Sequence, residues 1–263
     1  MTSDLLLGID IGTSSTKAIL MRPDGRCVGL GTKTYAVNTP QPGWAEQRPE
    51  TWIEAIAVAT HAAMHEAESA PGDIRGIGLS GQMHGTVCLN AAGDPVRPAI
   101  IWADQRSGEE VTWVRETLGQ ARLAKWTGNP LATGFMLASW LWLKRHEPET
   151  MTETAALLLP KDYVRHRLTG LKGTEPSDAS STLLFNPQER TWSQPLADAL
   201  ALDVAKLPPV SPSASIAGGL TSTIAERLGL AAGTPVVFGG SDQAMQALGN
   251  GLLDPGMLSA TIG

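Results

Sequence analysis

The sequence predicts an α/β fold in which helices flank a mixed central sheet and a mainly helical segment is inserted. Three observations support this prediction. β-Rich pieces open the chain, an amphipathic helix and a buried strand follow them, and the succession of strand, glycines, acid and helix appears again near residue 240. Helical patterns dominate the residues between these two parts.

The composition is typical of a globular protein, with 42% hydrophobic and 17% charged residues. A chain of 263 residues could form one large domain or two small ones. The net charge of −6 leaves no basic stripe for a phosphate backbone, so nucleic acid is not an expected partner.

The two cysteines, Cys27 and Cys88, lie far apart without paired spacing. This favours reduced thiols in the cytoplasm over a disulfide framework or a zinc site. No secretion signal is visible, and no apolar run approaches the roughly 20 residues needed to cross a bilayer. We therefore expect a cytoplasmic protein without a membrane partner.

The first elements are expected to form an antiparallel meander. Its β-rich pieces run from Leu5 to Ile11, from Lys17 to Met21 and from Cys27 to Val37. The sequence RPDG at 22–25 is a turn signal between the second piece and the third.

A helix and further strands follow the meander. Apolar residues recur at helical spacing from Pro49 to Glu68, with proline and acid near the start. Ile74 to Gly81 is short, apolar and glycine-ended, which predicts a buried strand, and TVCLN at 86–90 predicts another. The helical patterns of the insertion are Ser107 to Leu118, Gly134 to Arg145 and Asp162 to Leu168.

The last part of the chain returns to an α/β pattern. Ser211 to Gly219 is rich in small residues and predicts a loop, and a helix from Thr223 to Leu228 should end at Gly229. TPVVFGGSDQAMQALGNG predicts a buried strand and then a helix, and MLSATIG at 257–263 predicts a final strand.

The tip of the first hairpin is the first candidate site. Gly12 would let the backbone approach a ligand closely, and the hydroxyl cluster at 13–16 could form an anion-binding concavity. A carboxylate beside a phosphate needs an intervening cation, so Asp10 is a candidate magnesium ligand, and Lys17 could add positive charge. A plain hairpin with a polar tip is the alternative, because the P-loop spacing is absent and a strand, not a helix, follows the glycine.

Asp242 is the second candidate, because it follows a strand and two glycines at the start of a helix. Open α/β sheets tend to bind ligands at such strand ends. Helix N-capping by Asp242 or by Ser241 is the alternative role.

Two further strand ends carry polar and aromatic residues. Gln82, Met83 and His84 lie in a glycine-bracketed turn, and Trp102 and Asp104 follow the apolar run before them. An aromatic wall with charged groups suits a polyhydroxylated ligand. Core packing of the methionine, a structural histidine and an ordinary salt bridge are the alternatives.

These pieces, taken in order, resemble the FGGY family of carbohydrate kinases, and within it the xylulokinases. The resemblance covers essentially the whole chain, and its ordered set of motifs is specific although each motif alone is weak. SGQMHG is the piece that indicates the xylulokinase branch. The matching segments are 7–17, GWAEQRPETWI at 43–53, SGQMHG at 80–85, RPAIIWADQR at 97–106, LLLPKDYVRHRLTG at 157–170 and GGSDQA at 239–244.

The resemblance implies an actin-like, ribonuclease-H-like ATPase domain that uses ATP and Mg²⁺. It assigns Asp242 as the general base and Asp10 as the acid that holds magnesium. It places sugar contacts at Gln82, Met83, His84, Trp102, Asp104, Asp242 and Gln243, and nucleotide phosphate contacts at Gly12, Thr13, Ser14, Ser15, Lys17, Thr261 and Gly263.

The resemblance also implies that residues 1–263 are the first, sugar-binding domain of a kinase whose second, nucleotide-binding domain lies outside this chain. The expected reaction is phosphorylation of D-xylulose to D-xylulose 5-phosphate, with little turnover by this chain alone. Ribulose, gluconate or glycerol as acceptor remain alternatives, as does a non-catalytic sugar-binding module of the same fold. A homodimer is also open, since Trp140 and Trp142 could face a second copy, although core packing is the favoured role.

Overall fold

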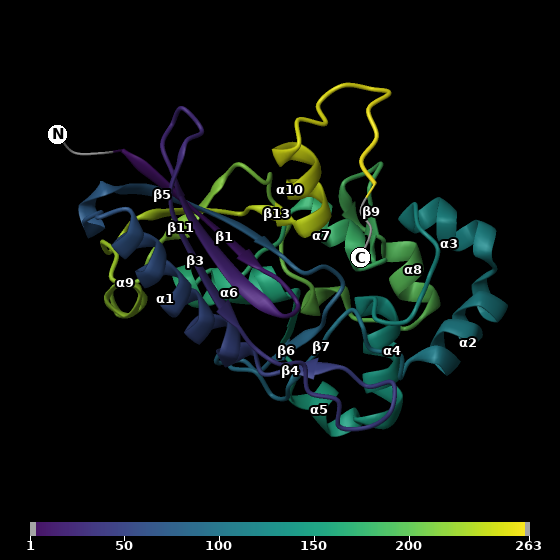
Figure 1. Cartoon of the computed structure of the whole chain (residues 1–263). Coiled ribbons are helices and arrows are strands. Elements are labelled where there is room, and N and C mark those ends of the chain that lie inside the picture. The colour runs from purple at the N-terminus through teal and green to yellow at the C-terminus, as the bar shows by residue number, and fades with distance from the viewer. Residues whose placement is uncertain (1–3, 261–263) are drawn as a thin grey trace.

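A seven-stranded mixed sheet organises the computed structural model, which describes residues 4–260 (Figure 1). The strand order is β11-β12-β5-β1-β2-β3, and β13 pairs with β5 as well. The strands are β1 (Leu5–Ile11), β2 (Ser15–Met21), β3 (Cys27–Thr34), β5 (Ile74–Gly81), β11 (Ile216–Gly219), β12 (Pro235–Val237) and β13 (Gly240–Ser241).

The predicted meander is confirmed, because β1, β2 and β3 pair antiparallel in sequence order. β2 begins two residues earlier than predicted, at Ser15, and β3 ends at Thr34 instead of Val37. The predicted helix is α1 (Pro49–Glu66), which carries the chain over to β5. β5 then pairs parallel with β1 from Leu5–Ile74 to Ile11–Gly81, as a crossover connection requires.

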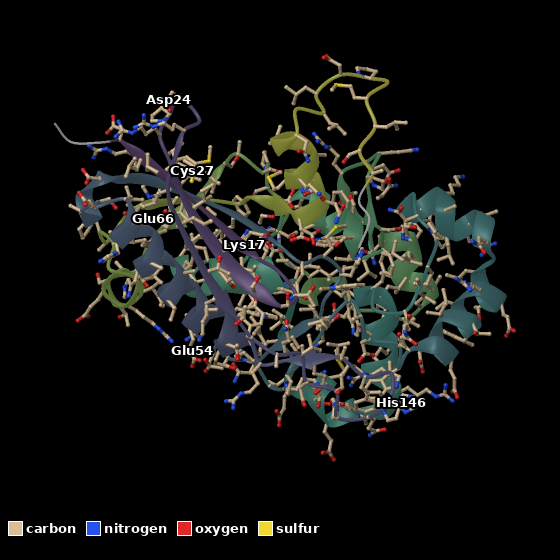
Figure 2. All side chains as sticks on the ribbon, in the orientation of Figure 1. Lys17, Asp24, Cys27, Glu54, Glu66 and His146 are labelled. Atoms are coloured by element: carbon tan, nitrogen blue, oxygen red, sulfur yellow. The ribbon has the colours of Figure 1, made fainter. Side chains whose placement is uncertain are left out.

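One face of the sheet is closed by helices. The odd-numbered residues of β1 are buried and pack with α1, α6 (Pro160–Thr169) and α9 (Ser222–Leu228) in one apolar core. Glycines in β3 allow α1 to lie unusually near, since a Cβ on Gly31 would come within 1.9 Å of the Ala59 carbonyl oxygen. At the end of α1, Glu66 accepts a hydrogen bond from the Leu30 amide at 2.8 Å, and its place beside the sheet can be followed in Figure 2.

The other face of the sheet is more open. The helix α10 (Asp242–Gly249) lies on this side (Figure 1). Leu6 and Leu30 expose 49% and 52% of their surfaces. The two faces therefore differ in how far apolar side chains are covered.

The helical insertion predicted for the middle of the chain is confirmed and has its own apolar core, formed around Leu137, Trp140 and Leu157. Trp140 and Trp142 are buried, so core packing is their role and they present no surface to a second copy. The further helices are α2 (Gly108–Leu118), α3 (Gln120–Thr127), α4 (Met136–His146), α5 (Pro148–Glu153), α7 (Pro176–Ser181), α8 (Gln194–Ala199) and the 3₁₀ turns η1 (Pro71–Asp73) and η2 (Val204–Lys206).

Separate two-stranded sheets accompany the main sheet. The predicted strand TVCLN is β6 (Val87–Leu89), which pairs with β8 (Ala156–Leu158). The other pairs are β4 (Glu46–Gln47) with β7 (Ala99–Ile100) and β9 (Phe185–Asn186) with β10 (Thr191–Trp192).

Two predictions for the last part of the chain are wrong. Ile216–Gly219, assigned to a loop, forms the edge strand β11, because pairing with β12 uses backbone groups and does not need β-branched side chains. Residues 257–260, assigned to a final strand, are exposed and unpaired, since no strand within residues 4–260 pairs with them. The remaining residues of that prediction, 261–263, lie outside the described range.

Within residues 4–260, no helix combines the length and the apolar character needed to cross a membrane.

Candidate active site

The carboxyl ends of three neighbouring parallel strands form one edge of the sheet. β1 and β13 both pair parallel with β5, and Ser80 of β5 is opposite Asp10 on one side and Gly240 on the other. Asp242 follows β13 directly. Two carboxylates that are 232 positions apart in the sequence are thereby brought to one edge, which is the edge where open α/β sheets bind ligands.

The two carboxylates interact electrostatically. The pKa of Asp242 is raised, chiefly because partial burial penalises the charged form, and in addition because the negative charge of Asp10 is near. A hydrogen bond from the Gln243 amide, 2.7 Å from Oδ1 of Asp242, acts in the opposite direction. A raised pKa of a partly buried carboxylate at a strand end is a feature of candidate proton-accepting groups.

Asp242 is the first residue of α10, and Ser241 is the N-cap. The Ser241 hydroxyl makes no capping hydrogen bond. The alternative of capping by Ser241 is therefore not realised, and Oδ1 of Asp242 accepts from the Gln243 amide in the first turn of its own helix. Gln243 itself is exposed.

The predicted hairpin tip is confirmed between β1 and β2, and several hydrogen bonds hold it. The Gly12 amide donates to the Ser15 carbonyl at 3.0 Å, and the Tyr35 hydroxyl donates to the Gly12 carbonyl at 2.6 Å. Nε2 of Gln47 donates to the Thr13 carbonyl at 2.7 Å. These bonds hold the backbone of the tip in place without a ligand.

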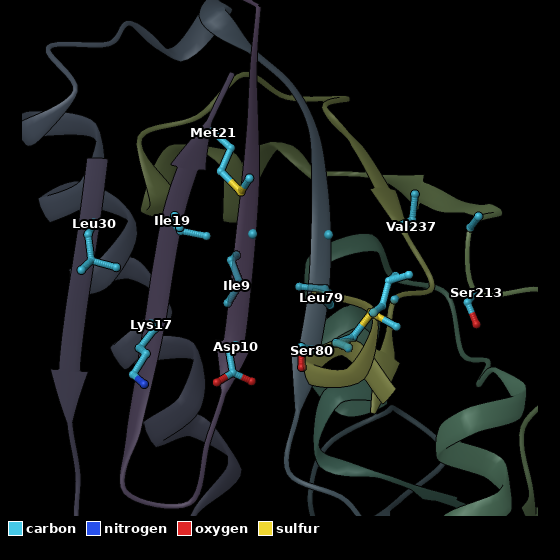
Figure 3. A pocket seen from close by; sticks show the side chains of 16 residues that line it. Ile9, Asp10, Lys17, Ile19, Met21, Leu30, Leu79, Ser80, Ser213 and Val237 are labelled. Carbon is cyan, nitrogen blue, oxygen red and sulfur yellow. The ribbon is translucent and has the colours of Figure 1, made fainter. Parts of the chain in front are cut away.

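Asp10 and Lys17 are directly opposite each other in the register of β1 and β2. Residues paired in this way project from the same face of a sheet, and Figure 3 shows both side chains at the same end of the open face. Oδ1 of Asp10 is buried and has no hydrogen-bond partner among the described residues. An unpartnered buried carboxylate oxygen fits the oxygen ligand that a divalent cation prefers.

No group of three or more His, Cys, Asp or Glu side chains within residues 4–260 could hold a metal ion by itself. A cation at Asp10 would therefore take most of its ligands from water and from a bound molecule. This matches magnesium, which commonly uses one or two carboxylates together with substrate phosphates.

A hollow of about 610 Å³ lies on the open face beside these residues (Figure 3). Asp10, Lys17 and Ser80 lie at one end of it. The remaining wall is mostly apolar and includes Ile19, Met21, Leu30, Val237, Met245 and Leu248.

The predicted sugar contacts Gln82 and His84 lie just past the end of β5. The Gln82 amide extends the strand by donating to the Ile11 carbonyl at 2.8 Å, and its side chain donates to Oε1 of Gln47 at 2.9 Å. Oε1 of Gln82 is buried and has no partner among the described residues. This amide oxygen is thus an unused hydrogen-bond acceptor in the interior, next to the turn that follows β5.

His84 has a left-handed backbone, with φ of 69°, and its ring lies 3.9 Å from that of Phe135. Nδ1 lies 2.8 Å from the Ser181 carbonyl, which can only accept, so Nδ1 carries the proton. Burial lowers the pKa of His84. The ring is therefore neutral near pH 7 and presents Nε2 as an acceptor.

Met83, the residue between them, is half-buried. Its carbonyl accepts a hydrogen bond from the Gly85 amide at 2.8 Å, which tightens the turn.

Trp102 links the predicted sugar wall to the hairpin tip. Its ring is half-exposed, and Nε1 donates to Oγ1 of Thr13 at 2.7 Å. The predicted sugar wall and the predicted phosphate loop therefore meet at this hydrogen bond.

Asp104 has a different environment from the one we predicted. It is buried, and its oxygens accept hydrogen bonds from the Ala45 amide and from the Arg106 backbone and guanidinium. Because both oxygens are occupied by protein donors, this geometry gives Asp104 a structural role and does not favour contact with a sugar.

Sequence reasoning missed the residues that support the site from beneath. Tyr35 and Gln47 donate hydrogen bonds to backbone carbonyls of the hairpin tip, and no local sequence pattern predicts such contacts. It also missed five fully buried ionisable side chains, here called the buried charge cluster: Lys161, Asp162, Arg165, Glu175 and Asp178. The segment LLLPKDYVRHRLTG carried the resemblance, but charged residues on a helix usually indicate a solvated face.

The predicted nucleotide contacts Ser14 and Ser15 lie at the tip, where the Ser14 carbonyl accepts from the Tyr35 amide at 3.0 Å. Thr261 and Gly263, also predicted as nucleotide contacts, lie outside the described residues.

The chain matches known proteins over most of its length. A family model described as the N-terminal domain of the FGGY family of carbohydrate kinases matches residues 5–249. Xylulose kinase of Lactococcus lactis subsp. lactis is 40% identical over 249 residues, which cover 95% of this chain and 50% of that protein. Xylulose kinase of Escherichia coli (strain K12) is 37% identical over 259 residues, which cover 98% of this chain and 52% of that protein.

A solved structure gives the same picture of the fold. Xylulose kinase from Rhodospirillum rubrum aligns with a TM-score of 0.90 and 29% identity, over 96% of this chain and 52% of that chain. The chain thus spans about half the length of the curated relatives it matches.

Proposed function

This chain belongs to the FGGY family of carbohydrate kinases, and on that premise we propose that it is the sugar-binding half of an enzyme that phosphorylates D-xylulose with ATP. Its fold is the predicted actin-like ATPase fold. The observation that carries the proposal is the meeting of Asp10 and Asp242 at one sheet edge, close enough for the charge of Asp10 to act on the pKa of Asp242.

Asp242 is the general base in this proposal. It would accept the proton of the attacking sugar hydroxyl as the phosphoryl group is transferred. Its raised pKa makes it a better proton acceptor than an ordinary aspartate, and general-base catalysis typically contributes about 10²–10⁴-fold in rate.

Asp10, Lys17 and the hydroxyls of the hairpin tip would hold the phosphates. Magnesium, when bound beside Asp10, would neutralise negative charge on the phosphate oxygens. Lys17 adds a positive charge on the same face of the sheet, and Thr13, Ser14 and Ser15 offer hydroxyl groups at the tip. Since Trp102 already holds the Thr13 hydroxyl, the tip is ordered before the phosphates arrive.

The sugar would lie against the turn after β5. Oε1 of Gln82 and the neutral ring of His84 offer acceptors for hydroxyl groups, and Trp102 offers an aromatic wall. Met83 lies between the two acceptors and would contact the carbon skeleton. We do not include Asp104 among the sugar contacts, because its oxygens are occupied.

The domain assignment belongs to the same proposal. Residues 1–263 would form the sugar-binding domain, and the nucleotide base would be held by the other half of the longer relatives. Closure of the two halves would then exclude water from the phosphoryl group.

Substitution of Asp242→Asn in the full-length protein tests this function. We expect kcat with D-xylulose and ATP to fall by about 10²–10⁴-fold, while D-xylulose binding measured by calorimetry changes little. Asp24→Asn is the matched control, since Asp24 is an exposed turn residue beyond the opposite end of β2. Full activity in Asp242→Asn would exclude it as the base.

A comparison of acceptors tests the substrate. D-Xylulose should give the highest kcat/KM among D-xylulose, D-ribulose, gluconate and glycerol. A higher kcat/KM for one of the other three acceptors would support the kinase activity but identify a different substrate. Sugar binding without any turnover by the full-length protein would indicate a binding module.

A further inference from the structure

The segment that carries Asp242 is a short, glycine-containing stretch, Phe238–Ser241, which we call the base segment. Gly239 has φ of 79°, and a Cβ there would come within 2.0 Å of the Leu79 carbonyl oxygen. Pairing with β5 extends over only two residues, Gly240 and Ser241. Glycines and a two-residue strand do not fix a backbone tightly by themselves, so other contacts must hold it.

Ser177 supplies one of these contacts. Its Oγ accepts a hydrogen bond from the Ser241 amide at 3.0 Å, directly before Asp242 in the chain. The same hydroxyl donates to the carboxylate of Glu175 at 2.8 Å from Oε1 and 2.9 Å from Oε2. The hydroxyl proton is thereby committed to Glu175, which leaves a lone pair directed at the base segment.

Glu175 connects three parts of the chain to this contact. It is fully buried and caps α7 by accepting from the amides of Ser177 and Asp178, each at 2.8 Å. It also accepts from the Ser213 hydroxyl at 2.8 Å. The Ser213 carbonyl in turn accepts from the Gly239 amide at 3.0 Å, so Glu175 supports the base segment by two separate routes.

Lys161 supports the other end of the base segment. Its ammonium group donates to the Phe238 carbonyl at 3.2 Å and lies 2.7 Å from Asp162, 3.3 Å from Asp178 and 3.8 Å from Glu175. The buried charge cluster therefore contacts the base segment at its first residue and, through Ser177, at its last. Charge-assisted hydrogen bonds shielded from water are stronger and more rigid than exposed ones.

We propose that Glu175 and Ser177 are positioning residues for Asp242, which hold the base segment so that the carboxylate of Asp242 faces Asp10 across the sheet edge. This inference rests on the proposed function, in which Asp242 is the base. Both act through the backbone of the base segment, Ser177 on the Ser241 amide and Glu175 through Ser177 and through Ser213. A displacement of about 1 Å in a reacting group can lower a rate by about 10²-fold, so such support affects kcat.

The test substitutes Ser177→Ala in the full-length protein and follows kcat and KM separately. We expect kcat to fall about tenfold while KM for D-xylulose stays within about twofold, because the proposed sugar contacts Gln82, His84 and Trp102 lie on other elements. Ser177→Thr retains the hydroxyl and should restore most of the loss. Ser180→Ala is the matched control: Ser180 is a half-buried serine of the same helix that donates to the Pro176 carbonyl and should keep wild-type kcat.

Amide hydrogen exchange of this chain gives an independent readout. In Ser177→Ala the amide of Ser241 should exchange at least about tenfold faster, with the central strands β1 and β5 unchanged. A general loss of stability would instead accelerate exchange throughout the sheet, and that outcome would overturn the positioning role.

Failure of this inference can be told apart from failure of the proposed function. If the wild-type protein does not phosphorylate D-xylulose, or Asp242→Asn keeps full kcat, the proposed function fails. If both results are as expected but Ser177→Ala behaves as Ser180→Ala, only the positioning role is overturned. Should Ser177→Ala not fold, Ser213→Ala removes the second route, and an unchanged kcat in that variant would overturn the inference.

Discussion

Asp10 at the sheet edge and Glu175 in the buried charge cluster are carboxylates with opposite surroundings. At the edge, Oδ1 of Asp10 has no partner among the described residues, and Asp242 accepts from the amide that follows it. In the cluster, Glu175 accepts from two amides and two hydroxyl groups and is fully shielded from water. At the edge an oxygen of Asp10 is left without a protein partner among the described residues, whereas Glu175 in the cluster uses both of its oxygens to hold the surrounding chain.

This contrast explains why the two regions lie side by side. A site whose own residues make few contacts depends on a rigid neighbour, because strain or repulsion within it is not relieved locally. The buried charge cluster lies directly beneath the base segment and supplies that rigidity. Substitutions in the two regions should therefore have opposite effects on stability.

The largest expected effect is a loss of stability when the buried charge cluster is changed. Lys161→Met removes the cation that faces three buried carboxylates, and we expect the free energy of unfolding to fall by about 3–5 kcal/mol. Urea unfolding would measure it. Lys125→Met, at an exposed lysine of α3, is the control and should change stability by less than about 0.5 kcal/mol. A loss under about 1 kcal/mol for Lys161→Met would mean that the carboxylates are not held by this charge.

An intermediate effect is expected where the two predicted subsites meet. Trp102→Phe keeps an aromatic ring but removes the hydrogen bond to the Thr13 hydroxyl, which is worth about 1 kcal/mol. We expect kcat/KM of the full-length protein to fall about fivefold. Trp113→Phe, at a similarly exposed tryptophan of α2, should leave kcat/KM unchanged. Equal kcat/KM values for the two variants would show that the hydrogen bond from Trp102 to Thr13 does not contribute to the reaction.

The smallest effect is a gain in stability at the edge. The pKa of Asp242 is raised above its ordinary value of 3.8, so protonated Asp242 stabilises the fold below that pH. This contribution is lost as the pH rises through the folded-state pKa. Asp242→Asn should therefore raise the melting temperature by about 1–3 °C at pH 7 and leave it unchanged near pH 3. A lower melting temperature at pH 7 would contradict the sign of this pKa shift.

Much of the sheet could be predicted from the sequence because its strands follow simple patterns. β1 is a short apolar, β-rich run, and β5 is apolar and ends at a glycine, so both were bounded correctly. β11 was missed because Ile-Ala-Gly-Gly has no β-rich composition and its strand state depends on a partner that is distant in the sequence. The unpaired residues 257–260 show the converse, since an apolar run without a partner strand does not form one.

The site was predictable only in part, for a related reason. Asp10 and Asp242 stand out because Asp10 lies near the end of one strand, Asp242 directly follows another and glycines are close to both, and strand ends are where ligands bind. The contacts of Ser177 with Ser241 and of Trp102 with Thr13 join residues 64 and 89 positions apart, which no local pattern encodes. Asp104 looked like a ligand because it follows a strand, but the tertiary fold supplies its partners.

The apolar wall beside Asp10 and Lys17 also determines how salt acts on this edge. Counter-ions screen exposed charges over about 8 Å at physiological ionic strength, but they cannot enter hydrocarbon. Ile19 and Leu30 line the same hollow as the two charged groups, so dissolved ions can reach this pair only from the remaining directions. Because Lys17 is itself exposed, its attraction for an approaching anion should still weaken as salt is raised, but less steeply than at a lysine surrounded by water on all sides.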